Sequence, residues 1–257
     1  ASTPTEAGLI ARTTGAADAG SITVGSINGE ANVDLVINGS TISSNTQGAG
    51  DAGSIDLSGQ TLVLSNSTNI SSAATQSGDA GSITVSAQQL TLDASSITTQ
   101  ASQSGGGDIT LDVSDSLGFK DSNITASANG STTSDGGNVT LEAHTILSQN
   151  SAFLAQANQG NGGQINITAD TFLKDGESTL DASSSGGGID GDIGVDAVNS
   201  EDSIQTSQED PKFVNVAGML SKRCQAASAN DSSSFTVASD RVGATVPGDY
   251  QLSKLSN

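Results

Sequence analysis

The chain has 257 residues, of which only 2% are aromatic and none is Trp, a composition that excludes the thick core of a large globular enzyme. With 28 acidic against 8 basic residues, the net charge of −20 leaves no basic patch for nucleic acid or an anionic membrane surface. A single cysteine excludes an internal disulfide, and no apolar run is long enough to predict a membrane span.

The start of the chain has neither an initiator Met nor the charged-then-apolar pattern of a signal peptide. We therefore expect the sequence to be part of a longer or processed chain. The low hydrophobic fraction of 33% would by itself favour a disordered, solvated segment. The Ile, Leu and Val residues nevertheless recur in short, evenly spaced runs, and this spacing favours an ordered repeat.

A phrase of seven residues, typified by Asp-Ala-Gly-Ser-Ile-Thr-Val, recurs seven times along the chain. Its copies occupy 18–24, 51–57, 79–85, 105–111, 135–141, 161–167 and 189–195. Every copy has a glycine followed, at alternate positions, by two apolar residues. The glycines are Gly20, Gly53, Gly81, Gly107, Gly137, Gly163 and Gly191. The first apolar residues are Ile22, Ile55, Ile83, Ile109, Val139, Ile165 and Ile193.

Each repeat carries two further short apolar pieces after this phrase, such as 90–92 and Ile97. Alternation of apolar with polar β-branched residues, as in 83–85, is typical of β-strands. Three short strands cannot bury an apolar stripe alone, but stacked repeats bury a continuous core. We predict an all-β fold, a right-handed parallel β-helix of about seven three-strand coils over residues 1–195.

The recurring glycine predicts a tight bend, either because the backbone needs a positive φ or because a Cβ would clash with the neighbouring coil. The first residue of the phrase is acidic in four copies, namely Asp18, Asp51, Asp79 and Asp135, and is Asn161 in another. Carboxylates stacked on neighbouring coils could share calcium ions, so these four aspartates are candidate metal ligands. The alternative is a turn in which each side chain bonds its own backbone. No other cofactor is expected.

Residues 196–257 form a second predicted region, because the repeat fades there and five of the eight basic residues lie in it. Glu209-Asp210-Pro211, apolar residues at spacings of three and four, and Lys222-Arg223 predict a short amphipathic helix. With a strand at 233–237, this helix would cap the open edge of the last coil. Cys224 lies on its apolar face, where a buried structural thiol is the expected role.

The repeated phrase, together with Lys222-Arg223-Cys224-Gln225-Ala226 and Ser232-Ser233-Ser234-Phe235-Thr236-Val237, resembles the C-terminal part of filamentous-haemagglutinin-like exoproteins. The match runs over most of the chain, although the stretch 238–244 departs from the family's Gly-Arg-Gly-Gly phrase and the N-terminal secretion domain is not recognisable. The resemblance implies a right-handed β-helix exported by an outer-membrane two-partner secretion transporter. Family members with known roles are mostly adhesins, which implies a secreted or outer-surface location and a glycan or cell-surface receptor.

One catalytic alternative to a passive shaft rests on clustered carboxylates. Four carboxylates crowd one repeat and leave open a polysaccharide-active enzyme that works with carboxylates alone: Asp108, Asp112, Asp115 and Asp121. His144 has no catalytic partner near it in the sequence, and we expect it in a solvated position. Motifs for nucleophilic catalysis or phosphate binding are absent.

An ice-binding surface is the remaining alternative. Threonines share one outward position of the first strand at Thr23, Thr84, Thr110 and Thr140, but Asp56, Asn166 and Gly194 interrupt the row. A cross-strand ladder that stabilises the sheet explains the same residues. The favoured function is therefore a non-catalytic secreted or cell-surface adhesin that presents a rigid shaft. A polysaccharide-active enzyme and a calcium- or ice-binding matrix protein are the alternatives.

Overall fold

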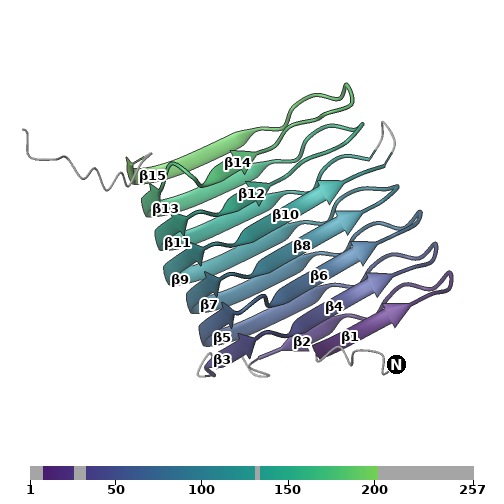
Figure 1. The fold of residues 1–257 in the computed structure, drawn as a ribbon, viewed down its shortest axis with the longest axis horizontal. Coiled ribbons are helices and arrows are strands. Elements are labelled where there is room, and N and C mark those ends of the chain that lie inside the picture. The colour runs from purple at the N-terminus through teal and green to yellow at the C-terminus, as the bar shows by residue number, and fades with distance from the viewer. Residues whose placement is uncertain (1–7, 26–32, 131–133, 202–257) are drawn as a thin grey trace, which may run out of the picture. The chain divides into compact units, whose positions relative to one another are not determined.

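The computed structural model describes residues 8–25, 33–130 and 134–201, which form a parallel β-solenoid of about six turns with no helix. Figure 1 shows the strands of successive turns side by side, from the purple first turn to the green last one. Within these described ranges, no helix has the length and hydrophobicity needed to cross a membrane. The helix and strand predicted as a cap, and Cys224, lie outside the described residues.

The strands form two parallel sheets. The sheet of long strands contains β2 Ile22–Val24, β3 Leu35–Asn38, β5 Ile55–Ser65, β7 Ile83–Asp93, β9 Ile109–Lys120, β11 Val139–Gln149, β13 Ile165–Lys174 and β15 Ile193–Glu201. The sheet of short strands contains β1 Gly8–Thr13, β4 Thr41–Thr46, β6 Asn69–Ala74, β8 Ser96–Ala101, β10 Asn123–Ala128, β12 Ala152–Leu154 and β14 Thr179–Asp181. Within each sheet, a strand pairs with its counterparts in the turns before and after it.

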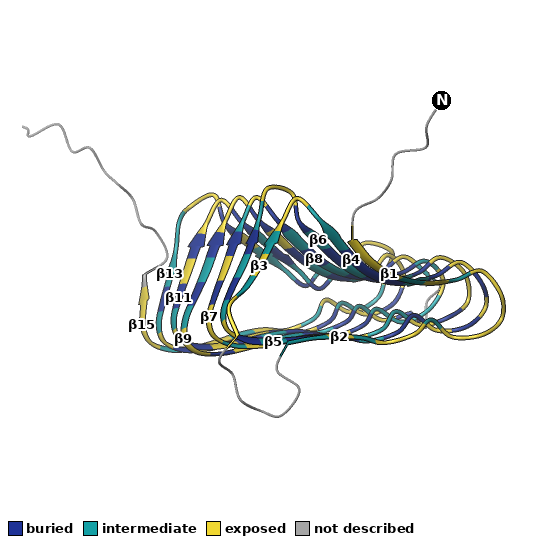
Figure 2. Ribbon diagram, turned by 90° about the horizontal axis from the view of Figure 1, so that it is seen from below, coloured by how far each residue is buried: buried dark blue, intermediate teal, exposed yellow. Residues whose placement is uncertain are grey.

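The first two strands predicted for each repeat run together as one long strand that bends at a corner. β2 pairs with positions 55–57 of β5, whereas β3 pairs with positions 62–65 of the same strand. Each turn therefore has a first face from the early part of the long strand, a second face from its later part and a third face from the short strand (Figure 2). The parallel β-helix is confirmed, while its right-handed sense stays a prediction. Seven copies of the phrase delimit about six turns because the last copy only begins another.

The core consists of straight aliphatic columns that run through the stack. The first apolar position of the phrase is fully buried at Ile55, Ile83, Ile109, Val139 and Ile165. One column changes composition where Phe119 pairs with the small, buried Ser148. The ring of Phe119 meets that of Phe153 edge-on, with centroids 4.8 Å apart. Two aromatic rings thus fill the volume that a larger residue at Ser148 would occupy.

The columns keep their register although the repeats differ in length. Residues 25–34, ten in number, separate Val24 from Leu35, where only four separate their partners Leu57 and Leu62. β9 takes up one extra residue at a bulge opposite residues 87–89 of β7. A column can therefore be followed from turn to turn whatever the length of the intervening corner.

Candidate functional site

The glycine column marks a close approach between the backbones of successive turns. A Cβ on Gly137 would lie 2.1 Å from the carbonyl oxygen of Gly107, and one on Gly163 would lie 2.0 Å from that of Gly137. None of the seven glycines of the phrase is among the residues with positive φ. Of the two explanations that the sequence allowed, the clash with the neighbouring coil is therefore the one that the geometry supports. From Gly53 onward, these glycines let successive turns pack closely.

Buried hydroxyl groups from the third face close this glycine corner. The Ser44 hydroxyl donates to the carbonyl oxygen of Gly20 at 2.6 Å and accepts from the backbone N–H of Gly53 at 3.1 Å. One turn later, Ser72 makes the same pair of bonds with Gly53 and Gly81, at 2.8 and 3.0 Å. The hydroxyl column thus satisfies backbone groups that would otherwise be buried without partners.

The candidate calcium aspartates bond each turn to the next. The backbone N–H of Asp51 donates to Asp18 Oδ1 at 2.9 Å, that of Asp79 donates to Asp51 Oδ1 at 2.8 Å, and that of Asn161 donates to Asp135 Oδ1 at 2.7 Å. Each of these Oδ1 atoms therefore bonds the neighbouring turn, a role that the sequence-based alternative of a local turn did not include. Among the residues that the structure describes, no group of three or more His, Cys, Asp or Glu side chains is placed to hold a metal ion.

Gly105 interrupts this ladder, since it supplies no side-chain acceptor. Asp79 still accepts from the N–H of Gly105 at 3.0 Å and from the Ser104 hydroxyl. A second ladder of the same kind lies three residues further along the phrase, where Asp108 Oδ1 accepts from the N–H of Asn138 at 2.8 Å and Asn138 Oδ1 accepts from that of Gln164 at 2.9 Å. Sequence reasoning missed this second ladder because its members differ in residue type.

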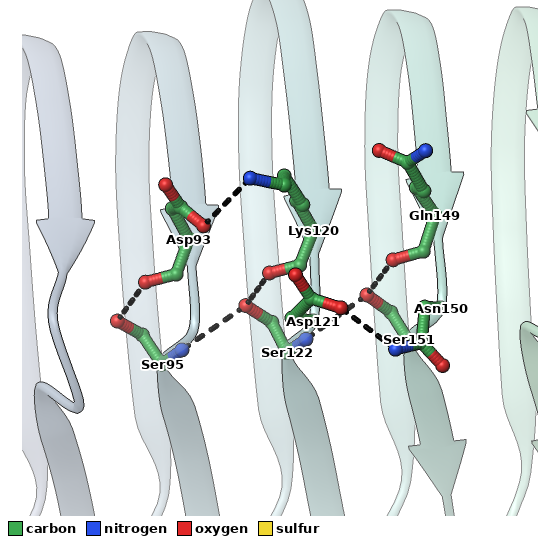
Figure 3. Close-up of polar contacts among 8 residues, drawn as sticks. All are labelled: Asp93, Ser95, Lys120, Asp121, Ser122, Gln149, Asn150 and Ser151. Carbon is green, nitrogen blue, oxygen red and sulfur yellow. Dashed lines mark hydrogen bonds and ion pairs between the residues drawn. The ribbon is translucent and has the colours of Figure 1, made fainter.

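A column of buried serines occupies the corner between the second and third faces (Figure 3). The hydroxyl groups of Ser95, Ser122 and Ser151 donate to the carbonyl oxygen two residues earlier at 2.7–2.9 Å. Each hydroxyl of Ser122, Ser151 and Ser178 also accepts from the backbone N–H of the serine one turn earlier, at 3.1–3.2 Å. Every hydroxyl group at the centre of this column therefore bonds within its own turn and to a neighbouring turn.

Left-handed backbone turns the chain into this serine corner. Ala94, Asp121 and Asn150, which directly precede the serines, have φ between 45° and 50°. Asn and Asp adopt this conformation more readily than other residues with a side chain. Asn150 Nδ2 also donates to Asp121 Oδ1 at 2.7 Å, which links the two turns on the outside of the corner. Serines directly before the third strand, often after Asn or Asp, were the signal that could have revealed the column.

The threonine row and the four crowded carboxylates are the residues on which the ice-binding and enzyme alternatives depend. The threonine row is confirmed in register but interrupted: Thr84, Thr110 and Thr140 are consecutive partners, flanked by Asp56 and Asn166. The four crowded carboxylates are spread around the turn. Asp108 bonds the neighbouring turn before the first strand, Asp112 lies on the first face, Asp115 accepts from Gln89 at the bulge, and Asp121 lies at the serine corner.

A shallow groove of about 540 Å³ nevertheless gathers acidic groups on this face. Asp112 and Glu142 are register partners there. His144, expected in a solvated position, is 62% exposed, which confirms that expectation. Its Nδ1 lies 2.5 Å from Asp170 Oδ2, a carboxylate from the next turn and therefore distant in the sequence. Asp196 completes the lining.

Comparison with known proteins identifies no relative. No protein-family model matches the chain, nor does any curated protein or solved structure. The resemblance to filamentous-haemagglutinin-like exoproteins therefore stays a prediction from the sequence phrase, and the functional argument rests on the solenoid and its surface.

Proposed function

We propose that the chain is part of a secreted or cell-surface protein whose right-handed β-helical shaft mediates attachment and catalyses no reaction. Export through an outer-membrane two-partner secretion transporter, and binding to a glycan or cell-surface receptor, belong to the same proposal. These finer parts draw on the resemblance of the repeated phrase to filamentous-haemagglutinin-like exoproteins. The β-solenoid supplies the shaft.

The observation that supports this proposal is that the repeated polar residues form hydrogen bonds between successive turns. The aspartates of the phrase bond the next turn, and the buried serines do the same at the opposite corner. The glycines let the turns approach closely. Repetition of this kind lengthens a rigid surface with every added turn, since each turn contacts only its neighbours. A catalytic site, in contrast, depends on one exceptional cluster.

An antiserum raised against the chain tests location and role together. We expect it to label intact cells of the native organism and to be lost after protease treatment of those cells. Its Fab fragments should reduce attachment of the cells to surfaces or to one another. Detection of the protein only inside the cells, or normal attachment under saturating Fab, would contradict the proposal.

A polysaccharide-active enzyme is the second candidate, and the acidic groove on the first face favours it. Asp112 and Glu142 are neighbours on adjacent turns, and His144 pairs with Asp170 close by. Carboxylates placed together are the groups that glycoside hydrolysis needs. Release of reducing ends from a polysaccharide by the full chain, abolished in both Glu142→Gln and Asp170→Asn, would favour the enzyme. Absence of release from a broad polysaccharide panel would leave attachment as the function.

A further inference from the structure

Gly118 is an unusual residue for its position, since it lies on the outward side of β9 within the second face. Nothing lies within 4 Å of where its Cβ would be, and its φ is not positive. Neither space nor backbone conformation therefore requires glycine there. A glycine inside a strand is less favourable than a residue with a side chain, by about 0.5–1 kcal/mol relative to Ala. Gly118 lines a hollow in the second face.

The hollow is a groove of about 580 Å³ that crosses several turns. Thr91 and Leu147, the register partners of Gly118 on either side, form its walls, and Leu147, which is 44% exposed, contributes apolar surface. Lys120 and Gln149 border it at the serine corner, and the turn at Asp175–Glu177 closes one end. An apolar floor with polar groups along one edge is the usual composition of a small-molecule or glycan site.

Charge restricts the ligand. The Lys120 ammonium group lies 3.6 Å from Asp93 Oδ1, so the basic group at the edge is paired with a carboxylate. Asp175 and Glu177 add further negative charge at the closed end. In a chain with a net charge of −20, this edge repels acidic polymers such as polyuronates. Neutral and cationic polymers remain, and we consider the neutral ones because the groove offers an apolar contact at Leu147.

The spacing between successive turns restricts the identity of the ligand further. Strands of successive turns are about 4.8 Å apart, close to the advance per sugar of an extended β-linked pyranose chain. Such a chain laid along the groove would meet Thr91, Gly118 and Leu147 in the same sequence as successive sugar rings. The apolar faces of the rings would pack on the walls, and their hydroxyl groups would bond Gln149, Lys120 and the carboxylates at the edge.

We propose that the groove over Gly118 is a binding site for a neutral, β-linked polysaccharide. The inference deepens the proposed attachment function and rests on it. Gly118 is the residue that determines access, because any outward side chain at that position would stand where a ring must lie. Leu147 supplies the apolar contact.

The test uses the full chain and immobilised neutral β-linked glucan, xylan, mannan and chitin oligosaccharides, with polygalacturonate as the acidic comparison. We expect the wild type to bind at least one neutral glycan and not polygalacturonate. Gly118→Thr should weaken that binding at least about tenfold without lowering the melting temperature, because the site for the new side chain is open. Leu147→Ser should weaken it as well.

Gly194→Thr is the matched control, an outward glycine on the first face whose Cβ would meet only the Asn166 side chain, at 3.3 Å. It should bind like the wild type. Failure of the wild type to bind any neutral glycan, or equal binding by Gly118→Thr, would overturn the site. If Fab fragments still block cell attachment in that case, the attachment function stands and its receptor binds elsewhere.

Discussion

The glycine corner and the serine corner join successive turns in different ways. At the glycine corner, backbones pack directly on one another, and the space left for a Cβ at Gly137 is too small by more than an ångström. At the serine corner, a side chain stands between the turns, and its hydroxyl group bonds both of them. The glycine corner therefore depends on the absence of a side chain at the glycine itself, next to which the Ser44 and Ser72 hydroxyls bond the backbone. The serine corner depends on a particular polar atom at the contact between turns.

This difference teaches which substitutions each corner can tolerate. The glycine corner should reject every larger residue, since each would force the turns apart. The serine corner should reject residues that lack a hydroxyl group of the right reach, even when their volume fits. A steric clash between backbones costs more free energy than the loss of a hydrogen bond. Substitutions at the glycine corner should therefore destabilise the protein more than substitutions at the serine corner.

The largest effect is expected for Gly137→Ala. Its Cβ would lie 2.1 Å from the Gly107 carbonyl oxygen, so the turns must separate, at a cost of roughly 3 kcal/mol in the free energy of unfolding. Urea or thermal unfolding measures it. Gly118→Ala is the matched control in open space and should be as stable as the wild type or slightly more so. Equal losses of unfolding free energy in Gly137→Ala and Gly118→Ala would contradict the steric explanation of the glycine corner.

A smaller effect is expected for Ser122→Ala at the serine corner. The change removes the acceptor of the Ser95 N–H and the donor to the Lys120 carbonyl, which costs about 1–3 kcal/mol because buried groups lose their partners. Ser86→Ala, on the exposed side of the first face, should stay within about 0.5 kcal/mol of the wild type. A neutral Ser122→Ala would mean that the column contributes no stability.

The exposed aspartate ladder should be more tolerant, and its response separates hydrogen bonding from calcium binding. Asp51→Ala removes the acceptor of the Asp79 N–H and should cost about 0.5–1.5 kcal/mol, whereas Asp51→Asn keeps an oxygen acceptor and should be nearly neutral. We expect calcium and chelator to leave the melting temperature of the wild type unchanged. A clear rise with calcium, lost in Asp51→Asn, would instead assign the aspartates to a metal.

The smallest effect should appear on acidification. Burial raises the pKa of Asp175. Hydrogen bonds from the Ser178 hydroxyl and from the backbone N–H groups of Asn150, Ser178 and Glu177 outweigh this effect, so the pKa of Asp175 lies below its ordinary value. The pKa of Asp181 is lowered as well. Hydrogen bonds from Ser183 and Gln156 lower it, and they outweigh the effect of burial, which raises it. A lowered folded-state pKa stabilises the protein above the unfolded value and loses that contribution as the pH falls through the folded one. Thermal melts of wild type and Asp175→Asn should therefore differ near neutral pH and converge below about pH 4. A difference that does not change with pH would contradict the assignment.

The fold could be predicted from the sequence because its core columns are periodic. Ile83 and Val85 mark a strand by alternation, and the same pair recurs in each copy, so the stacking follows. The identity of the glycine column followed from the same phrase. About seven coils were predicted and the described residues form about six turns, because the last copy of the phrase begins a turn that those residues do not finish.

The polar partners could not be predicted, because they lie one turn away in a chain rich in similar residues. Nothing next to His144 in the sequence indicates Asp170, and nothing next to Asp18 indicates the N–H of Asp51. The serine column was hidden by the abundance of serine, since only register distinguishes Ser122 from exposed neighbours. The groove over Gly118 depends on an outward glycine whose orientation becomes clear only when the strand is placed.

Amide hydrogen exchange of single residues tests most directly whether the polar columns hold the turns together. The N–H of Ser122 donates to the hydroxyl group of Ser151, one turn later, at 3.1 Å. In Ser151→Ala, the account predicts faster exchange at Ser122, with little change at Ser95, whose N–H still donates to the Ser122 hydroxyl. Unchanged exchange at Ser122, or an equal increase throughout the solenoid, would contradict a ladder of specific bonds between turns.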